Sequence, residues 1–159
     1  MPALKPAGLD FLAQAPTISH ADVTIGRSPA DVWAALTDTA GWPQWFAGMR
    51  AARATSDGGG VGGTRFIDLG LLRADEEFVA WEPERRFAFT VVRTNVPLAR
   101  RWVEQVELAP APTDDGRDGT RMRYTGAVDL LPLNKPFASV FARQTSRAWA
   151  RSFANLDAA

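Results

Sequence analysis

The chain has 159 residues, 46% hydrophobic and 23% charged, which is enough to bury the core of one globular domain and too apolar for extended disorder. Basic and acidic residues both total 18, so the charge balance gives no reason to expect nucleic acid or an anionic membrane as partner. Cysteine is absent and His20 is the only histidine, which excludes disulfides, thiolate metal sites and most zinc, haem or Ser-His-Asp arrangements.

Two further absences bear on location and cofactors. No apolar run approaches the roughly 18 residues that span a bilayer, and the N-terminus lacks the pattern of a secretory signal. Gly58, Gly60 and Gly63 fit GxGxxG, but a predicted strand follows where the dinucleotide fingerprint needs a helix. We therefore expect a cytoplasmic protein with no transmembrane segment, no metal and no cofactor.

The first elements of the chain are an arm, a strand and a capped helix. Residues 1–17 are rich in proline and alanine and are predicted to form an N-terminal arm, and residues 18–159 a single domain. Apolar residues spaced along 18–26 predict the first strand. Ser28 followed by Pro29 is typical of a helix start, because serine caps free amides and proline lacks an N–H that would be unpaired there.

The stretch TAGWPQWF, at residues 39–46, places three aromatic rings at a turn. Its glycine and proline end the first helix and lead into a second short helical piece around 44–47. Each ring can bury about 150–250 Å², so the rings face either a core or a cavity. We expect Trp45 and Phe46 to wall a cavity and Trp42 to pack under the sheet edge; the alternative is that all three are core.

Strand patterns then alternate with short turns until a final helix. The predicted strands are 49–56, 63–70, 73–82, 85–93, 99–110 and 120–131. Because the turns are short, neighbouring strands should pair as antiparallel hairpins. Residues 137–156 lack glycine and proline and repeat apolar residues at three- and four-residue steps, which predicts one long amphipathic helix.

This order of elements indicates an α+β fold. A curved antiparallel sheet of about seven strands has one face to bury, and only the C-terminal helix is long enough to cover it. We therefore predict a helix-grip fold, in which the sheet wraps around the C-terminal helix and two short helices after the first strand plug one end.

Period-two alternation places three polar residues in apolar rows that we assign to the concave face of the sheet. The rows are Ala74, Glu76, Phe78 and Ala80; Trp102, Glu104, Val106 and Leu108; and Met122, Tyr124, Gly126, Val128 and Leu130. A lone buried carboxylate costs several kcal/mol unless it is paired or protonated. Both glutamates therefore need either a partner or water.

Two interpretations of these glutamates stay open. In the first, each pairs with an arginine near the rim of the sheet. The candidate arginines are Arg65, Arg101 and Arg147. In the second, Glu104 and Tyr124, together with Glu76, orient or protonate the oxygen of a ligand, since burial raises the pKa of a glutamate and tyrosine donates a hydrogen bond.

Two predicted hairpin tips carry apolar residues where polar turn residues are usual. Leu71 and Leu72 stand at one tip, and Pro97 and Leu98 at the other. Apolar tips commonly cover a pocket mouth, a partner or a membrane surface. We expect these four residues to gate a pocket, with a homodimer contact as the alternative.

Four stretches of this chain are shared in pattern with a known group of proteins: IGRSPADVWAALTD (25–38), GWPQW (41–45), GVGGTRF (60–66) and AWEPERRFAF (80–89). With the closing helix, they resemble the START-like superfamily in its bacterial polyketide cyclase/dehydrase-type (SRPBCC) branch. The resemblance covers residues 18–156. It implies a deep cavity between sheet and C-terminal helix that holds apolar or aromatic molecules, and it carries over no catalytic residue.

We predict that the protein binds a small hydrophobic, aromatic or lipid-like molecule in this cavity. One alternative is a metal-free enzyme for cyclisation, dehydration or isomerisation, with Glu104 and Tyr124 as candidate catalytic residues. A second alternative is a protein-interaction module that docks through the apolar tips. The predicted ligand-binding residues are Trp45, Phe46, Ile67, Leu69, Glu76, Phe78, Phe89, Trp102, Glu104, Tyr124, Phe141, Thr145 and Trp149.

Overall fold

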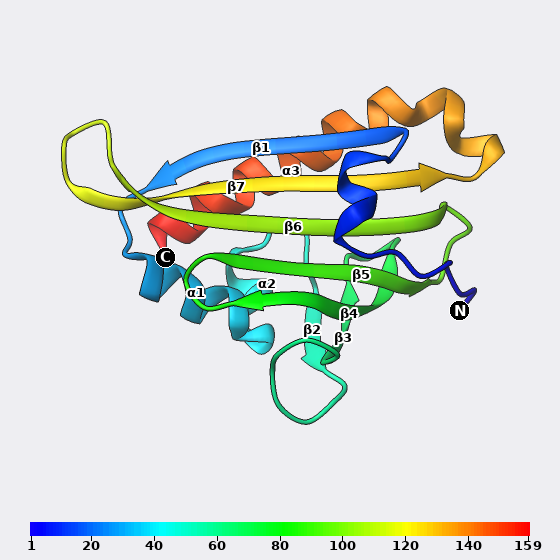
Figure 1. The fold of residues 1–159 in the computed structure, drawn as a ribbon, viewed down its shortest axis with the longest axis horizontal. Helices are drawn as coiled ribbons and strands as arrows, with labels where there is room; N and C mark the ends of the chain where they lie inside the picture. Colours follow the sequence, from blue (N-terminus) through cyan, green and yellow to red (C-terminus); the bar gives the residue numbers. More distant parts are fainter.

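The computed structural model describes residues 1–159, and its elements follow the predicted order (Figure 1). The strands are β1 (Thr17–Ile25), β2 (Ala51–Ala54), β3 (Thr64–Asp68), β4 (Arg73–Glu82), β5 (Arg86–Thr94), β6 (Ala99–Pro112) and β7 (Asp118–Leu130). The helices are α1 (Pro29–Thr37), α2 (Trp42–Trp45) and α3 (Ala138–Ala158), with 3₁₀ helices η1 (Leu9–Ala13), η2 (Thr39–Gly41) and η3 (Pro132–Phe137).

All seven strands belong to one antiparallel sheet, in the order β1-β7-β6-β5-β4-β3-β2. Strands β2 to β7 pair with their neighbours along the chain as predicted, and β1 closes the order by pairing with β7. Helix α3 crosses one face of this sheet, and α1 and α2 lie together at one end (Figure 1). The predicted α+β helix-grip fold is therefore confirmed.

The short helices are held by local hydrogen bonds that the sequence anticipates. The Ser28 hydroxyl oxygen accepts a hydrogen bond from the Asp31 N–H at 3.1 Å, and Pro29 is the first residue of α1. The Trp42 indole N–H donates to the Leu36 carbonyl at 3.0 Å, which ties the start of α2 to α1. Both rings of the GWPQW stretch are buried.

Helix α3 packs unevenly along its length. Its fully buried residues, Trp149, Ser152, Phe153 and Leu156, all lie in the second half. There the Ser152 hydroxyl oxygen accepts from the Ala47 N–H at 2.9 Å, and the Asn155 amide donates to the Trp45 carbonyl at 3.0 Å. The first half buries no residue completely, so space remains between it and the sheet.

One predicted row of the concave face is interrupted. The pairing of β4 with β5 shifts between Phe78 and Ala80, which is a β-bulge. Beyond the bulge, Trp81 packs against the main core and Ala80 pairs with Ala88. The expectation that Ala80 shares the side of Glu76 was therefore wrong, because one extra residue reverses the alternation.

The N-terminal residues cover the other face of the sheet, opposite α3 (Figure 1). The Phe11 ring is buried against Val103 and Ala127 on β6 and β7. The backbone N–H of Leu4 donates to the Val92 carbonyl at 2.9 Å. The boundary between an arm and a domain near residue 17 stays a prediction. No helix is both long enough and apolar enough to cross a membrane.

Candidate functional site

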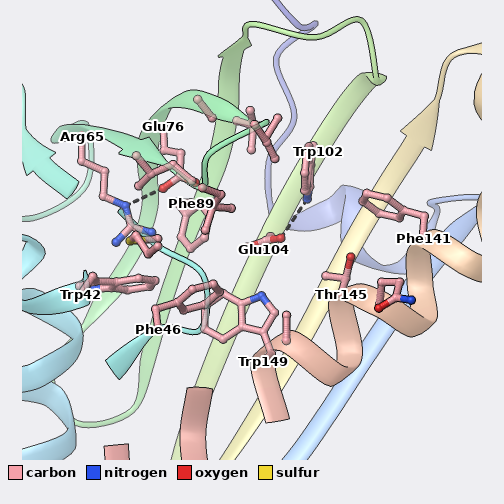
Figure 2. A pocket seen from close by; sticks show the side chains of 18 residues that line it. Trp42, Phe46, Arg65, Glu76, Phe89, Trp102, Glu104, Phe141, Thr145 and Trp149 are labelled. Carbon is pink, nitrogen blue, oxygen red and sulfur yellow. Dashed lines mark hydrogen bonds and ion pairs between the residues drawn. The ribbon is translucent and has the colours of Figure 1, made fainter. Parts of the chain in front are cut away.

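A cavity of about 290 Å³ lies between the sheet and the first half of α3 (Figure 2). Thirteen of its eighteen lining residues are hydrophobic. Strands β3 to β6 contribute one wall and α3 the facing one. The cavity is therefore an apolar space between two elements that pack tightly only at one end.

Three aromatic rings form the end of the cavity next to α2. Trp42 and Phe46 are four residues apart and stack with centroids 5.5 Å apart. Trp149 of α3 stands edge-on to both, at 5.9 Å from Trp42 and 4.8 Å from Phe46. Such edge-to-face pairs are a favoured aromatic geometry, so these rings make a packed and well-defined surface.

A buried ion pair forms part of the sheet wall. Arg65 on β3 and Glu76 on β4 are directly opposite in the register, and the Arg65 Nε–H donates to Glu76 Oε2 at 2.5 Å. The guanidinium lies 4.0 Å from the Trp42 ring centroid and 4.5 Å from that of Phe89. Its Nη1 is buried without a hydrogen-bond partner. The Arg65 side chain is only 1% exposed, so this cation is held inside the protein.

Glu104 on β6 reaches the cavity without an ion-pair partner. Its Oε1 accepts hydrogen bonds from the Trp102 indole N–H at 3.0 Å and from the Tyr124 hydroxyl at 2.9 Å. Both bonds use the same oxygen, which leaves Oε2 free for another group. Figure 2 shows the Glu104 carboxyl between the Arg65 end of the cavity and the end formed by Phe141 and Thr145.

The buried acids have raised pKa values. The pKa of Glu104 is raised from 4.5 to about 7. Burial is the largest cause and the Glu76 charge adds to it, while the hydrogen bonds from Tyr124 and Trp102 oppose the rise. Burial also raises the pKa of Glu76, against the attraction of Arg65. The pKa of the Tyr124 hydroxyl lies well above its usual value, because of burial and then the adjacent Glu104. Near neutral pH, Glu104 can therefore hold or release a proton.

Of the two interpretations that the sequence left open, one describes Glu76 and the other describes Glu104. Glu76 pairs with Arg65, as in the first interpretation. Glu104 has no arginine partner and lines the cavity, as in the second. Of the other candidate arginines, Arg101 lies over the Phe11 ring at 5.2 Å and Arg147 is exposed on α3.

Ten of the predicted ligand-binding residues line the cavity. They are Phe46, Ile67, Leu69, Glu76, Phe89, Trp102, Glu104, Phe141, Thr145 and Trp149. Their contact with a ligand stays a prediction, but the structure brings them around one space.

Three predicted residues lie outside the lining, which corrects their expected position. The Trp45 ring centroid lies 4.7 Å from that of Trp42, outside the cavity lining. Trp42 and Phe46 stack with each other and occupy the side that faces the cavity. Phe78 packs among the rings near α1, 5.0 Å from Trp81. Tyr124 is covered by the Trp149 ring, which stacks on it at 4.4 Å.

The lining also includes residues that were not among the predicted ligand-binding residues. They are Trp42, Met49, Arg65, Ala74, Val91, Gln144 and Ala148. The position of Trp42 could have been predicted from its spacing to Phe46, since residues four apart lie on the same side of a helical turn. Trp42 thus lines the cavity where Trp45 was expected.

Of the four expected gate residues, only Leu72 lines the cavity. Leu71 is 91% exposed, and its carbonyl accepts a hydrogen bond from Asn95 at 3.1 Å. The carbonyls of Pro97 and Leu98 accept from Asn134 of η3 at 2.9 and 3.0 Å. Asparagine side chains therefore connect the first tip to the second and the second to η3. A gating role and a homodimer contact stay predictions.

A family model described as polyketide cyclase / dehydrase and lipid transport matches residues 17–159. This chain belongs to that family. Its START-like, SRPBCC assignment therefore agrees with the resemblance seen in the sequence, and the family and fold make it a ligand-binding domain of that type. Neither the family nor the fold defines the ligand.

Mycobacteria contain proteins similar to this chain. An uncharacterized protein of Mycobacterium tuberculosis is 28% identical over 151 residues, which cover 94% of this chain and 87% of the relative. A START superfamily protein from Mycobacterium smegmatis has a similar structure, with a TM-score of 0.71 and 14% identity over 86% of this chain and 94% of that one.

A plant structure shares the same fold. Ginseng major latex-like protein 151 from Panax ginseng has a TM-score of 0.66 and 18% identity, covering 89% of this chain and 95% of that one. At such identities the similarity concerns the fold alone.

Proposed function

We propose that this family member binds a small hydrophobic, ring-containing molecule in the cavity between the sheet and α3. The observation that carries the proposal is an apolar space with few polar groups, Arg65, Glu76 and Glu104 among them, set into an aromatic lining. Ligand sites are commonly built this way, since apolar walls supply affinity and a few polar groups supply orientation.

The size of the cavity supports a small ligand. An apolar cavity of about 150 Å³ holds one benzene molecule, and this cavity of about 290 Å³ is roughly twice as large. A molecule of one or two rings, or one short acyl chain, matches that space. A lipid with two long chains would need a larger one.

Native mass spectrometry of the purified protein, followed by solvent extraction, tests the proposal. Ala148 lines the cavity from α3, whereas Ala154 is exposed on the same helix. We expect a small hydrophobic adduct that Ala148→Trp loses and Ala154→Trp keeps. Thr145→Phe serves as a second filling variant, and circular dichroism checks that each variant folds.

Two outcomes would contradict this function. One is an adduct retained in both filling variants, which would place the ligand elsewhere. The other is a chain without adduct whose tryptophan fluorescence responds to no compound in a library of one- and two-ring molecules. Because Trp42, Trp102 and Trp149 line the cavity, occupation should change that fluorescence.

A second candidate is an enzyme for cyclisation, dehydration or isomerisation in the same cavity. The favouring observation is Glu104, whose pKa of about 7 suits a general acid or base near neutral pH. Tyr124 would act through its hydrogen bond to that carboxyl, as a positioning residue. In that case Glu104→Gln abolishes turnover and leaves binding largely intact. Unchanged turnover would remove Glu104 from the chemistry.

A further inference from the structure

We infer that the ligand is a neutral ring compound whose oxygen accepts a hydrogen bond from Glu104. We also infer that the cavity rejects the corresponding carboxylates and amines; both statements rest on the proposed function. A ketone or aldehyde attached to one or two aromatic rings is the simplest member of this class.

The Glu104 carboxyl is held in place through one oxygen, while its other oxygen forms no hydrogen bond within the protein. Trp102 and Tyr124 both donate to Oε1, at 3.0 and 2.9 Å, so the carboxyl plane is held from two strands. Oε2 forms no hydrogen bond within the protein, and Glu104 lines the cavity. Oε2 is not one of the buried atoms that lack a partner, and it is the carboxyl oxygen left to form a hydrogen bond with a ligand in the cavity.

The charges around the cavity disfavour an anionic ligand. Arg65 is the one cationic residue of the lining, and its guanidinium is already neutralised by Glu76 at 2.5 Å. A ligand carboxylate would therefore lose its hydration with no free positive charge to balance it, and above about pH 7 it would also meet the Glu104 charge. Like charges held close together in a buried site repel strongly.

The same arrangement disfavours a cationic ligand. While Glu104 is protonated, an ammonium group would have the faces of the aromatic rings as its attractive partners. However, the Arg65 guanidinium already lies over the Trp42 and Phe89 rings, at 4.0 and 4.5 Å. A second cation would have to approach this one within the same small cavity.

The donor that remains favours an acceptor on the ligand. Protonated Glu104 donates through Oε2, whereas the unpaired Arg65 Nη1 is buried and is not accessible from the cavity. The ionisable groups that face Glu104 are Arg65 from β3, Glu76 from β4 and Tyr124 from β7, while the lining residues of β5 and α3 carry none. Binding of a carbonyl should therefore stabilise protonated Glu104. Above about pH 7, where the free protein has lost this proton, binding should take a proton up, and the affinity should decrease as the pH rises.

Four probes of nearly the same shape test the inference. They are acetonaphthone, its methylene isostere isopropenylnaphthalene, naphthoate and naphthylethylamine, all substituted at the same ring position. Affinities are measured by calorimetry and by protein NMR at pH 6 and pH 8. At pH 6 the donor is the neutral, protonated Glu104, and a neutral hydrogen bond predicts that acetonaphthone binds about 2- to 10-fold more tightly than isopropenylnaphthalene. Both charged probes should bind more weakly than isopropenylnaphthalene.

Variants of Glu104 separate recognition from packing. Glu104→Gln keeps a neutral donor at the same place, so we expect acetonaphthone affinity to be retained and its decrease between pH 6 and pH 8 to disappear. Glu104→Met removes the donor and should bring the ketone and its isostere to the same affinity. Glu107→Gln, on the outer face of the same strand, is the control and should behave as the unmodified chain.

The outcomes distinguish this inference from the proposed function. Equal binding of acetonaphthone and isopropenylnaphthalene would overturn the inference and leave a hydrophobic site in place. Tightest binding of naphthylethylamine or naphthoate would also overturn it, because Glu104 or Arg65 would then act as a counter-ion. If none of the four probes binds, the inference and a site for two-ring compounds both fail.

Discussion

The Tyr124 hydroxyl donates a hydrogen bond to Glu104 Oε1 at 2.9 Å, and neither side chain has an arginine to pair with. The bond joins β7 to β6 behind the Trp149 ring, which covers Tyr124 from the cavity. It therefore ties the one unpaired carboxyl of the cavity to the structural core. Changes at either residue should affect both stability and the protonation of the site.

Removing that bond should raise the pKa of Glu104. The Tyr124 hydrogen bond lowers this pKa, against burial and the Glu76 charge. We expect Tyr124→Phe to move the Glu104 titration above about 7 and to reduce the free energy of unfolding by about 1 kcal/mol. Carbon-detected NMR of the glutamate carboxyls and urea denaturation measure the two effects. A Glu104 titration that moves downward would contradict the assigned role of the hydroxyl.

The stability of the chain should decrease between about pH 4.5 and pH 7 because of Glu104. The folded state keeps the Glu104 proton up to about pH 7, whereas the unfolded chain loses it near 4.5. The folded state thus binds more protons in this window, and the free energy of unfolding falls as pH rises through it. At about 1.4 kcal/mol for each pKa unit, the loss is about 3 kcal/mol above pH 7.

Glu104→Gln isolates this contribution, since Glu76 titrates in both proteins. We expect the variant to exceed the unmodified chain in stability at pH 8 and to approach it near pH 4.5. Urea denaturation at several pH values measures the difference. If the stability difference between the variant and the unmodified chain does not change with pH, Glu104 has the same pKa in the folded chain as in the unfolded one.

Replacing only one residue of the buried Arg65–Glu76 ion pair should reduce the free energy of unfolding more than replacing both residues. Arg65→Met leaves the Glu76 charge buried and unpaired, which typically costs about 3–5 kcal/mol. The double variant Arg65→Met with Glu76→Leu leaves no buried charge and should recover most of that loss. Both side chains are nearly inaccessible, at 1% and 4% exposed. Equal stabilities of the single and double variants would argue against a strong pair.

Ser152→Ala should loosen the end of the cavity next to α2. The serine hydroxyl oxygen accepts from the Ala47 N–H at 2.9 Å and is fully buried, so its loss leaves that N–H without a partner. We expect a cost of about 1–3 kcal/mol in thermal or urea denaturation. Ser139→Ala, at an exposed position of the same helix, is the matched control and should change stability little.

Local sequence patterns determined the elements of this fold. The Ser28–Pro29 start of α1, the short turns and the glycine-free last helix all act over a few residues, and each predicted the element found there. Alternation likewise placed Glu76 and Glu104 in the cavity wall, because side chains on a strand alternate regardless of what the strand pairs with.

Only the tertiary structure decided which of these residues meet. The bulge between Phe78 and Ala80 reversed the alternation of β4, and bulges carry no reliable local signal. The pairing of Arg65 with Glu76, rather than with Glu104, follows from the register of β3 against β4. Whether Trp42 or Trp45 faces the cavity depends on how α2 docks on α3. Such choices are set by contacts between residues distant in sequence, and the local pattern of a strand or helix does not contain them.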